Sequence, residues 1–479
     1  MRLRDPKRYP TLRLPARSVA SPGLGSSVGE EIELTAGAVA HGGHCVARIE
    51  NNDAAGQPNP DGGRVVFVRH ALPGERVLAR ITDKGKIWRA DAIAVLDNES
   101  PYRVPPCWPE AGPNGVGGGE LSHVSPAGQR LWKAAVLAEQ MRRLAGVDVA
   151  KVNPSLAISA LTFQPLHHAH PEAPGAEPAA NWPEAAGYRT RIDLISNAAG
   201  QLGMRQARSH DVVPLTDMPL ATDRLREFAA ESGIWQQRWP AGSRVTIEAP
   251  NRSNPVVLLD GEPLAAHEDT QILREFVRVG DRTYEYQIAP GGFWQVHANA
   301  PETLVAAVLA AAGDLEARRV LELYSGSGLF TLPLAVGIGP KGKLITVEGA
   351  KAAVESAQRN LAALREQMGK KALPPTEQLA GSVGRTLTRL QMSQPHLRFN
   401  LIVVDPPREG LEKGVVEQLA TFEADRIIYI SCDPAALARD TSRLIQTGYQ
   451  LINLRAFDLF PHTHHVESIA FFDRIEHML

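Results

Sequence analysis

The sequence predicts a multi-domain α/β protein, and three regions of the chain support this fold class. Short strand-like runs separated by turns between residues 31 and 96 indicate a small β-barrel. Strand signals mixed with a helix near 219–232 indicate an α+β domain in the middle of the chain. From about residue 301 onward, helices alternate with apolar strands, which is typical of a doubly wound, Rossmann-like parallel sheet.

The length of 479 residues is too great for one ordinary core, so two or three domains are expected. We expect a basic arm and linker over residues 1–27, the barrel over 28–96, a central α+β domain over 97–288 and the parallel-sheet domain over 289–479. The stretch 165–186 is crowded with Ala, Pro, His and Glu, and we expect it to form a flexible loop.

Hydrophobic spacing predicts the main elements. Barrel strands are expected at 31–34, 65–68, 76–79 and 91–95, and parallel strands at 320–323, 344–347, 401–404 and 427–430. A helix is expected over 127–145, with a buried stripe formed by Leu131, Ala134, Ala135, Ala138 and Met141.

Composition narrows the class of protein. A hydrophobic content of 43% and a charged content of 22% are ordinary for a globular chain. We find no apolar run of about 18 residues and no apolar signal-like stretch, so a cytoplasmic protein without a membrane span is expected. The net charge is −2, but the arm at 1–17 is basic. It either follows phosphates or is a solvated tail.

Two motifs at predicted strand ends suit a nucleoside ligand. Residues 320–328 run from a strand into a Gly-x-Gly turn, where glycines let a cofactor approach the backbone. Glu348 ends the next strand, where an acid can hold ribose hydroxyls. Asp405 follows a later strand and precedes two prolines that stiffen the turn. The ligand is a dinucleotide or S-adenosylmethionine; a purely structural turn is the alternative for both motifs.

Cys432 is a candidate nucleophile. The predicted strand 427–430 delivers it to the carboxyl edge of the sheet, ahead of Asp433 as a helix N-cap and Pro434 as the first helical residue. Unpaired N–H groups at a helix start favour a thiolate. The alternative is a buried core cysteine. The other cysteines, Cys45 and Cys107, lie far apart in the sequence, so neither a disulfide framework nor a four-cysteine metal site is expected.

The segment 460–467 contains three histidines and Glu467. No second cluster supplies further ligands, so no metal site is predicted. Glu467 precedes an apolar run and should lie at the start of a strand. A carboxylate at a cleft edge can take a proton; an ordinary strand-end charge is the alternative.

Together these motifs resemble the TRAM-containing RNA 5-methyluridine methyltransferase family, which includes ribosomal and transfer RNA uracil-C5 methyltransferases. The resemblance is strongest at 292–296, 405–408, 431–440 and 460–467. It implies an OB-like TRAM barrel that binds RNA and a C-terminal methyltransferase domain dependent on S-adenosylmethionine. It also implies cofactor binding by Gln295, Tyr324, Glu348 and Asp405, a nucleophilic Cys432, and Glu467 as the base that deprotonates carbon 5.

The implied activity is methyl transfer to carbon 5 of a uridine in RNA through a covalent Cys432 adduct. The barrel favours ribosomal RNA as the partner, and we expect a monomer. The alternatives are the same chemistry on transfer RNA and a non-catalytic RNA-binding relative. A nicotinamide dehydrogenase fits poorly, because Thr331 stands where the third spaced glycine would be.

The chain departs from the family pattern at several positions. His297, Ser382 and Asp433 replace an asparagine, an acidic residue and an asparagine, respectively. Many relatives hold a [4Fe–4S] cluster with four cysteines, but here residues 116–123 contain none, and Cys107 alone cannot hold a cluster.

We therefore predict that the protein binds no iron–sulfur cluster. Protein purified without oxygen should contain no stoichiometric iron or sulfide and should lack the broad visible absorption of a cluster. Iron and sulfide at four atoms per chain would contradict this expectation.

Overall fold

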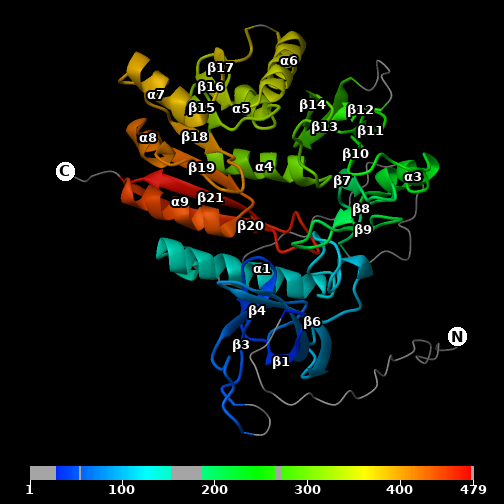
Figure 1. Ribbon diagram of the computed structural model, residues 1–479. Helices are drawn as coiled ribbons and strands as arrows, with labels where there is room; N and C mark the ends of the chain where they lie inside the picture. The colour runs from blue at the N-terminus through cyan, green and yellow to red at the C-terminus, as the bar shows by residue number, and fades with distance from the viewer. Residues whose placement is uncertain (1–27, 53–55, 153–184, 265–270, 370, 476–479) are drawn as a thin grey trace, which may run out of the picture.

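The computed structural model describes residues 28–52, 56–152, 185–264, 271–369 and 371–475. The basic arm and linker at 1–27 and nearly all of the loop predicted at 165–186 lie outside these residues. The described chain forms a small barrel, a central α+β region and a C-terminal parallel-sheet domain (Figure 1). The predicted fold class is therefore confirmed.

The barrel is one sheet with the strand order β1-β5-β6-β4-β3-β2. Its strands are β1 (Glu31–Thr35), β2 (Val39–Ala40), β3 (His44–Arg48), β4 (Val65–Arg69), β5 (Arg76–Lys84) and β6 (Trp88–Asp97). Because β1 also packs against β3, the sheet closes on itself. Alternate residues of β4 and β5 are buried, which matches a sheet with one solvated face.

The central region contains an antiparallel sheet with the order β12-β11-β10-β7-β8-β9 and a separate β13–β14 hairpin. Their bounds are β7 (Arg191–Ser196), β8 (Leu202–Arg205), β9 (Val212–Pro214), β10 (Arg244–Glu248), β11 (Val256–Leu259), β12 (Glu262–Pro263), β13 (Leu273–Val279) and β14 (Arg282–Ile288). The helix predicted near 219–232 is α3 (Asp223–Glu231), which begins after Thr222 because the Thr222 side chain accepts a hydrogen bond from Leu225 N–H.

The C-terminal sheet has the order β17-β16-β15-β18-β19-β21-β20, in which β21 is antiparallel to β19 and β20. Its strands are β15 (Arg319–Leu323), β16 (Lys343–Glu348), β17 (Thr376–Ala380), β18 (Leu401–Val404), β19 (Arg426–Ser431), β20 (Tyr449–Phe457) and β21 (Glu467–Arg474). The helices of this domain are α4 (Ala300–Ala312), α5 (Thr331–Ile338), α6 (Lys351–Met368), α7 (Val383–Ser393), α8 (Val415–Thr421) and α9 (Pro434–Gln446). The four predicted parallel strands are confirmed. The strand order reverses beside β15, which is where ligands bind in open α/β sheets.

Helix α1 (Pro126–Gln140) joins the barrel to the C-terminal domain, lying between them in Figure 1. It continues as a π-helical turn, η2 (Met141–Ala145). Trp132 and Val136 pack into the barrel core, whereas Leu137 and Met141 pack into the core of the C-terminal domain. The stripe predicted for this helix was partly wrong, because Leu131 is exposed. A single-stripe pattern does not describe a helix that is buried on two faces.

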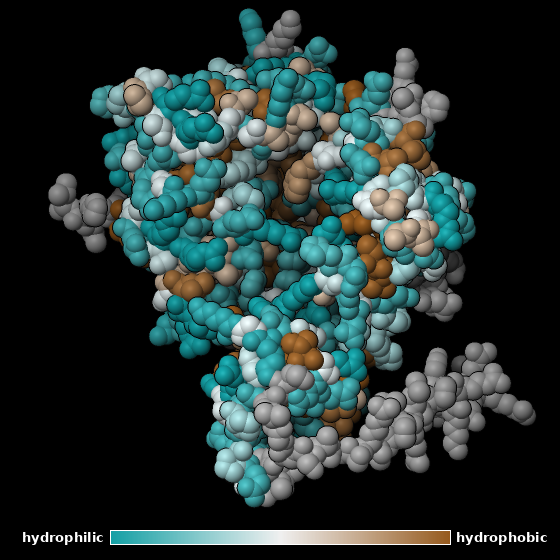
Figure 2. Space-filling model, in the orientation of Figure 1, coloured by the Kyte–Doolittle hydropathy of each residue, from teal (hydrophilic) through white to brown (hydrophobic). Residues whose placement is uncertain are grey.

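The remaining short elements are η1 (Pro109–Ala111) and α2 (Val149–Val152). None of the helices in the described ranges combines the length and apolar character needed to cross a membrane. On the face shown in Figure 2, the surface is largely hydrophilic and is hollowed between the C-terminal domain on the left and the central region on the right.

A buried ion pair fastens α1 to the C-terminal domain. Lys133 Nζ lies 2.5 Å from Asp458 Oδ1 and donates a second hydrogen bond of 2.9 Å to the Phe460 carbonyl. The Lys133 side chain is fully buried and that of Asp458 is 4% exposed. Removing one partner of such a pair leaves an uncompensated charge in the interior.

We predict that Lys133→Met lowers the free energy of unfolding by about 3–5 kcal/mol, the cost of stranding a buried charge. The change is measured by urea unfolding followed through tryptophan fluorescence. The double variant Lys133→Met/Asp458→Leu should regain much of the loss, because it removes both charges. As a control, Arg76→Ala breaks the exposed pair with Glu33 and should cost under about 1 kcal/mol. An equal loss in Lys133→Met and in this control would contradict the prediction.

Candidate active site

The carboxyl edge of the parallel sheet gathers five of the six predicted site residues. Tyr324 follows β15, Glu348 ends β16, Asp405 follows β18 and Cys432 follows β19. Glu467 begins β21, the antiparallel strand beside β19, as predicted. Since parallel strands end at one edge, their terminal side chains meet there.

The turn after β15 is shaped for close approach by a ligand. Tyr324 has a φ of 60°, which is unusual for a bulky residue, and its N–H donates to the Val347 carbonyl at 2.9 Å. Gly326 has a φ of 53°, and a Cβ placed there would meet no heavy atom within 4 Å. The backbone of Gly326 therefore borders open space. The predicted helix after this turn is α5, which starts at Thr331.

Glu348 ties this turn to the next strand. Its two carboxylate oxygens accept hydrogen bonds from Gly326 N–H at 2.9 Å and Ala350 N–H at 2.7 Å. Behind it, Glu322 on β15 is buried and accepts a hydrogen bond of 2.6 Å from Thr331 Oγ1. Burial, with a smaller contribution from the charges of Asp405 and Glu348, raises the pKa of Glu322 to about 8. Glu322 was not among the predicted site residues, although its place in the strand that leads to the Gly-x-Gly turn was a usable signal.

Asp405 faces the same carboxylates. Burial raises its pKa to about 7, and the charge of Glu348 adds to the rise. Asp405 thus changes protonation state in the neutral range, where most aspartates are ionised.

The register of two strands brings Cys432 and Glu467 together. Ser431 of β19 pairs with Ser468 of β21 in an antiparallel ladder. Cys432 and Glu467 are the residues next to this last pair, and the charge of Glu467 acts on the thiol.

The helix start that favours a thiolate at Cys432 is present, but burial of the thiol opposes it. Asp433 does cap α9, accepting from Ala436 N–H at 2.7 Å, and Pro434 is the first helical residue. However, burial and, to a smaller extent, the charge of Glu467 raise the pKa of Cys432 to about 12. The charge of Arg408 opposes this rise without cancelling it. The loss of solvation therefore affects the pKa of Cys432 more than the N-terminus of α9 does.

Glu467 is buried, with an exposed fraction of 4%. Burial raises its pKa well above the ordinary range, the charge of Asp405 raises it further, and Arg408 opposes both. Arg408 is exposed and acts on both candidate catalytic groups, so it is the cation that favours their ionised forms.

The donor set at this edge fits the expected cofactor. Glu348 and Asp405 offer carboxylate oxygens to hydroxyl and amino groups, and an acidic edge suits a cationic ligand. The open space beside Gly326 leaves room for a ligand against the backbone. Ser382, where relatives carry an acid, is the N-cap residue of α7 and adds no charge there.

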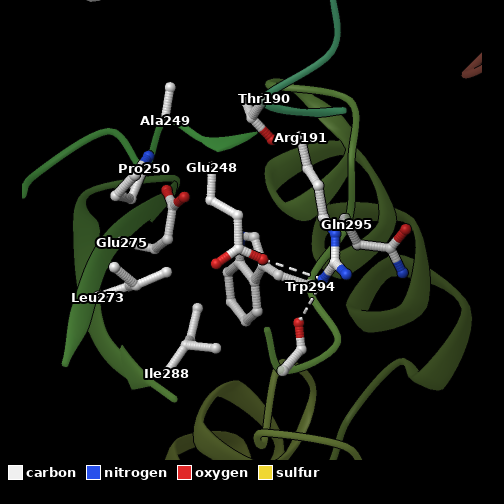
Figure 3. A pocket seen from close by; sticks show the side chains of 11 residues that line it. Thr190, Arg191, Glu248, Ala249, Pro250, Leu273, Glu275, Ile288, Trp294 and Gln295 are labelled. Atoms are coloured by element: carbon white, nitrogen blue, oxygen red, sulfur yellow. Dashed lines mark hydrogen bonds and ion pairs between the residues drawn. The ribbon is translucent and has the colours of Figure 1, made fainter. Parts of the chain in front are cut away.

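Gln295 lies in the wall of a different pocket, between the central sheet and the loop before α4 (Figure 3). Among the described residues, no hydrogen bond or ion pair joins it to the other five. Arg191 lies 3.0 Å from Glu248 Oε1 and donates to the Gly292 carbonyl, while Glu248 Oε2 accepts from Gly291 N–H at 3.0 Å. This pair fixes the loop that carries Gln295, and neither residue was predicted from the sequence. The Gln295 amide points away from Glu248 and Glu275.

The histidines of 462–465 make hydrogen bonds and ring contacts. His462 Nδ1 lies 3.3 Å from Cys107 Sγ and 3.1 Å from Gln129 Nε2, and His464 pairs with Glu120. His465 packs against the His464 ring at 4.1 Å between centroids. In the described part of the chain, no group of three or more His, Cys, Asp or Glu side chains has the arrangement to hold a metal ion.

Two of the residues that depart from the family pattern have structural roles. His297 is buried and stacks on Tyr188, with ring centroids 5.1 Å apart. Asp433 pairs with His41 of the barrel at 3.2 Å, in addition to capping α9. His41 was missed from the sequence, because nothing near position 41 indicates that its partner lies beside Cys432.

Comparisons with known proteins agree with this arrangement. Residues 265–475 match a family model described as tRNA (Uracil-5-)-methyltransferase, and residues 25–86 match one described as the TRAM domain. An uncharacterized RNA methyltransferase of Bifidobacterium longum is 38% identical, with 90% of this chain and 94% of that protein covered.

Two further matches are informative. The 23S rRNA (uracil(1939)-C(5))-methyltransferase of Pseudomonas fluorescens is 31% identical, with 93% of this chain and 95% of that protein covered. The crystal structure of a Pyrococcus abyssi tRNA (uracil-54, C5)-methyltransferase with S-adenosyl-L-homocysteine has a TM-score of 0.55 at 21% identity. It covers 91% of this chain and 99% of the archaeal one, and it shows the shared fold.

The raised pKa of Cys432 predicts how fast the thiol is alkylated. Because the thiolate reacts, the rate constant for Cys432 and iodoacetamide should rise about tenfold per pH unit from pH 7 to 10, without a plateau. Mass spectrometry of the peptide that contains Cys432 gives the rate. A synthetic peptide of residues 427–436 serves as the matched control and should level off near pH 8–9. A plateau in the folded protein at or below that of the peptide would contradict the raised pKa.

Proposed function

Because the chain belongs to the family of RNA uracil-C5 methyltransferases, we propose that it methylates carbon 5 of a specific uridine in ribosomal RNA through a covalent Cys432 adduct. The observation that carries the proposal is the pairing of Ser431 with Ser468, which leaves a thiol and a buried carboxyl group as the next residues on β19's end and β21's start, where the carboxylate acts on the thiol. A nucleophile and a base on neighbouring strands are the two groups this reaction needs.

The cofactor of this reaction, S-adenosylmethionine, supplies the methyl group from its sulfonium centre. We propose that Tyr324, Glu348, Asp405 and Gln295 hold it. Glu348 is already fixed by two backbone N–H groups, so its oxygens are oriented before any ligand binds. Asp405, with a pKa of about 7, can accept or donate a hydrogen bond at neutral pH.

Cys432 makes carbon 5 reactive. Carbon 5 of uracil is a weak nucleophile, but addition of the Cys432 sulfur to carbon 6 pushes the ring electrons toward the carbonyl oxygen and makes carbon 5 electron-rich. The thiol must first release its proton to solvent water, and Arg408 lowers the free energy of the anion that results. Burial, which disfavours the free thiolate, also keeps the thiol from reacting in the absence of RNA.

Glu467 completes the reaction. After methylation, carbon 5 carries both a proton and the methyl group. The Glu467 carboxylate takes the proton, the electrons of that C–H bond re-form the double bond to carbon 6, and the Cys432 sulfur leaves. Burial raises the pKa of Glu467, which makes its carboxylate a stronger base than an exposed glutamate.

The RNA must present an unstacked uridine, because carbons 5 and 6 are covered by neighbouring bases within a helix. We propose that the barrel binds the flanking RNA and that the basic arm at 1–17 adds phosphate contacts. The likeness to the bacterial 23S rRNA enzyme favours ribosomal over transfer RNA. We further propose that the enzyme acts in the cytoplasm as a monomer.

The direct test uses cofactor with a labelled methyl group. The protein should transfer label to ribosomal RNA from cells that lack the gene, and the product should be 5-methyluridine at one position. Cys432→Ala should reduce this transfer to under about a hundredth of the parent rate, since the covalent route has no cheap substitute. Labelling of transfer RNA instead would show that transfer RNA is the substrate. The absence of labelled uridine in both RNAs would refute the proposal.

We predict that Glu467→Gln traps a protein–RNA adduct. Glutamine keeps the size of the side chain but cannot accept the carbon-5 proton, so elimination stops after methylation. Denaturing gels should show a band that contains protein, RNA and labelled methyl. Glu467→Gln/Cys432→Ala should form no such band. Normal turnover by Glu467→Gln would remove Glu467 from the mechanism.

A further inference from the structure

A turn of the barrel reaches the C-terminal domain. We call His41–Gly43, the residues between β2 and β3, the barrel turn. His41 Nε2 lies 3.2 Å from Asp433 Oδ2, and the side chains are 34% and 22% exposed. Gly43 has a φ of 76°, and a Cβ added there would lie 2.8 Å from Glu120 Cγ and 3.5 Å from His464 Cβ. Only glycine allows so close an approach.

The first contact of the barrel turn is with the loop that carries Cys432. Asp433 follows Cys432 directly, and its two carboxylate oxygens have different partners. Oδ1 accepts from Ala436 N–H at the start of α9, and Oδ2 faces His41. Burial raises the pKa of Asp433, but hydrogen bonds from His41 and the α9 backbone outweigh it and leave the pKa lowered. The carboxylate is therefore ionised and held from two sides.

The second contact is with the segment that leads to Glu467. The His41 and His464 rings meet edge to face with centroids 6.0 Å apart. His464 is itself fixed, because its N–H donates to Glu120 Oε1 at 2.8 Å and its ring pairs with the same carboxylate. Thus the barrel turn touches both loops that carry the proposed catalytic pair.

We propose that the barrel turn positions Cys432 opposite Glu467 through the His41–Asp433 bridge, so that the barrel contributes to the rate of the chemical steps as well as to RNA binding. This inference rests on the proposed function. It also accounts for Asp433, where the family pattern has asparagine. An imidazole donor from the barrel binds a carboxylate more strongly than a neutral amide.

The test separates rate from affinity. His41→Ala should lower the single-turnover rate at saturating RNA and cofactor by about fivefold, the scale of a partly exposed bridge, and should change the Kd for RNA by less than about twofold. His41→Gln, which keeps an N–H donor, should recover part of the rate. The control Lys343→Ala, which breaks a partly exposed pair with Glu377 at the opposite edge of the parallel sheet, should change neither quantity. A weaker Kd with an unchanged saturated rate would reduce His41 to an RNA contact and overturn the inference.

A second measurement does not need RNA. Breaking the bridge should loosen the loop of Cys432 and raise its alkylation rate by iodoacetamide. His41→Ala and Asp433→Asn should each have this effect, Asp433→Asn more strongly because it also removes a charge that raises the pKa of Cys432. The double variant should match Asp433→Asn, because the bridge is already absent in that variant. Additive effects would overturn the bridge. If the wild-type protein methylates no RNA, the proposed function fails, yet this cycle still decides whether His41 positions Cys432.

Discussion

The crowding of carboxyl groups at one sheet edge governs the chemistry of this protein. Glu322, Glu348, Asp405 and Glu467 converge there, and their mutual repulsion adds to the effect of burial on three of the four pKa values. Arg408 is the nearby cation that acts on Glu467 and Cys432. Burial and this repulsion favour the protonated forms of Glu322, Glu467 and the Cys432 thiol. A nearby positive charge such as that of Arg408 favours the ionised forms of Glu467 and Cys432.

The elements that depend on local pattern were predictable from the sequence, whereas long-range partners were not. The apolar strands around Val320, Ile402 and Ile428 are buried on both faces, so each is a nearly continuous run of apolar residues that can be recognised in the sequence. The two buried faces of α1 pack against two different domains, so its apolar spacing did not correctly predict which residues are buried. The state of Cys432 depends on desolvation, which no motif reports. His41 lies in an ordinary-looking turn, and its role depends on the fold that carries it to Asp433.

Polar contacts join Cys107 and helix α1 to the C-terminal domain in the region where many relatives have cluster cysteines. Cys107 is within hydrogen-bond distance of His462, and Gln129 of α1 binds both the backbone and the ring of the same histidine. Trp108 is fully buried beside Gly119, whose missing side chain makes room for its ring. An aromatic side chain thus fills part of this region, and the hydrogen bonds of His462 fix the 460–465 segment.

The ion pair between Lys133 of α1 and Asp458, which follows β20, joins residues that are synthesised at very different times. Lys133 leaves the ribosome 325 residues before Asp458. At roughly 5–20 residues per second, this interval lasts roughly 15–65 s. For that time the barrel can fold against Trp132, while the opposite side of the helix presents Leu137, Met141 and an unmatched ammonium group to solvent or to a chaperone. The packing of α1 between the two domains can therefore be completed only after the segment with Asp458 has been synthesised.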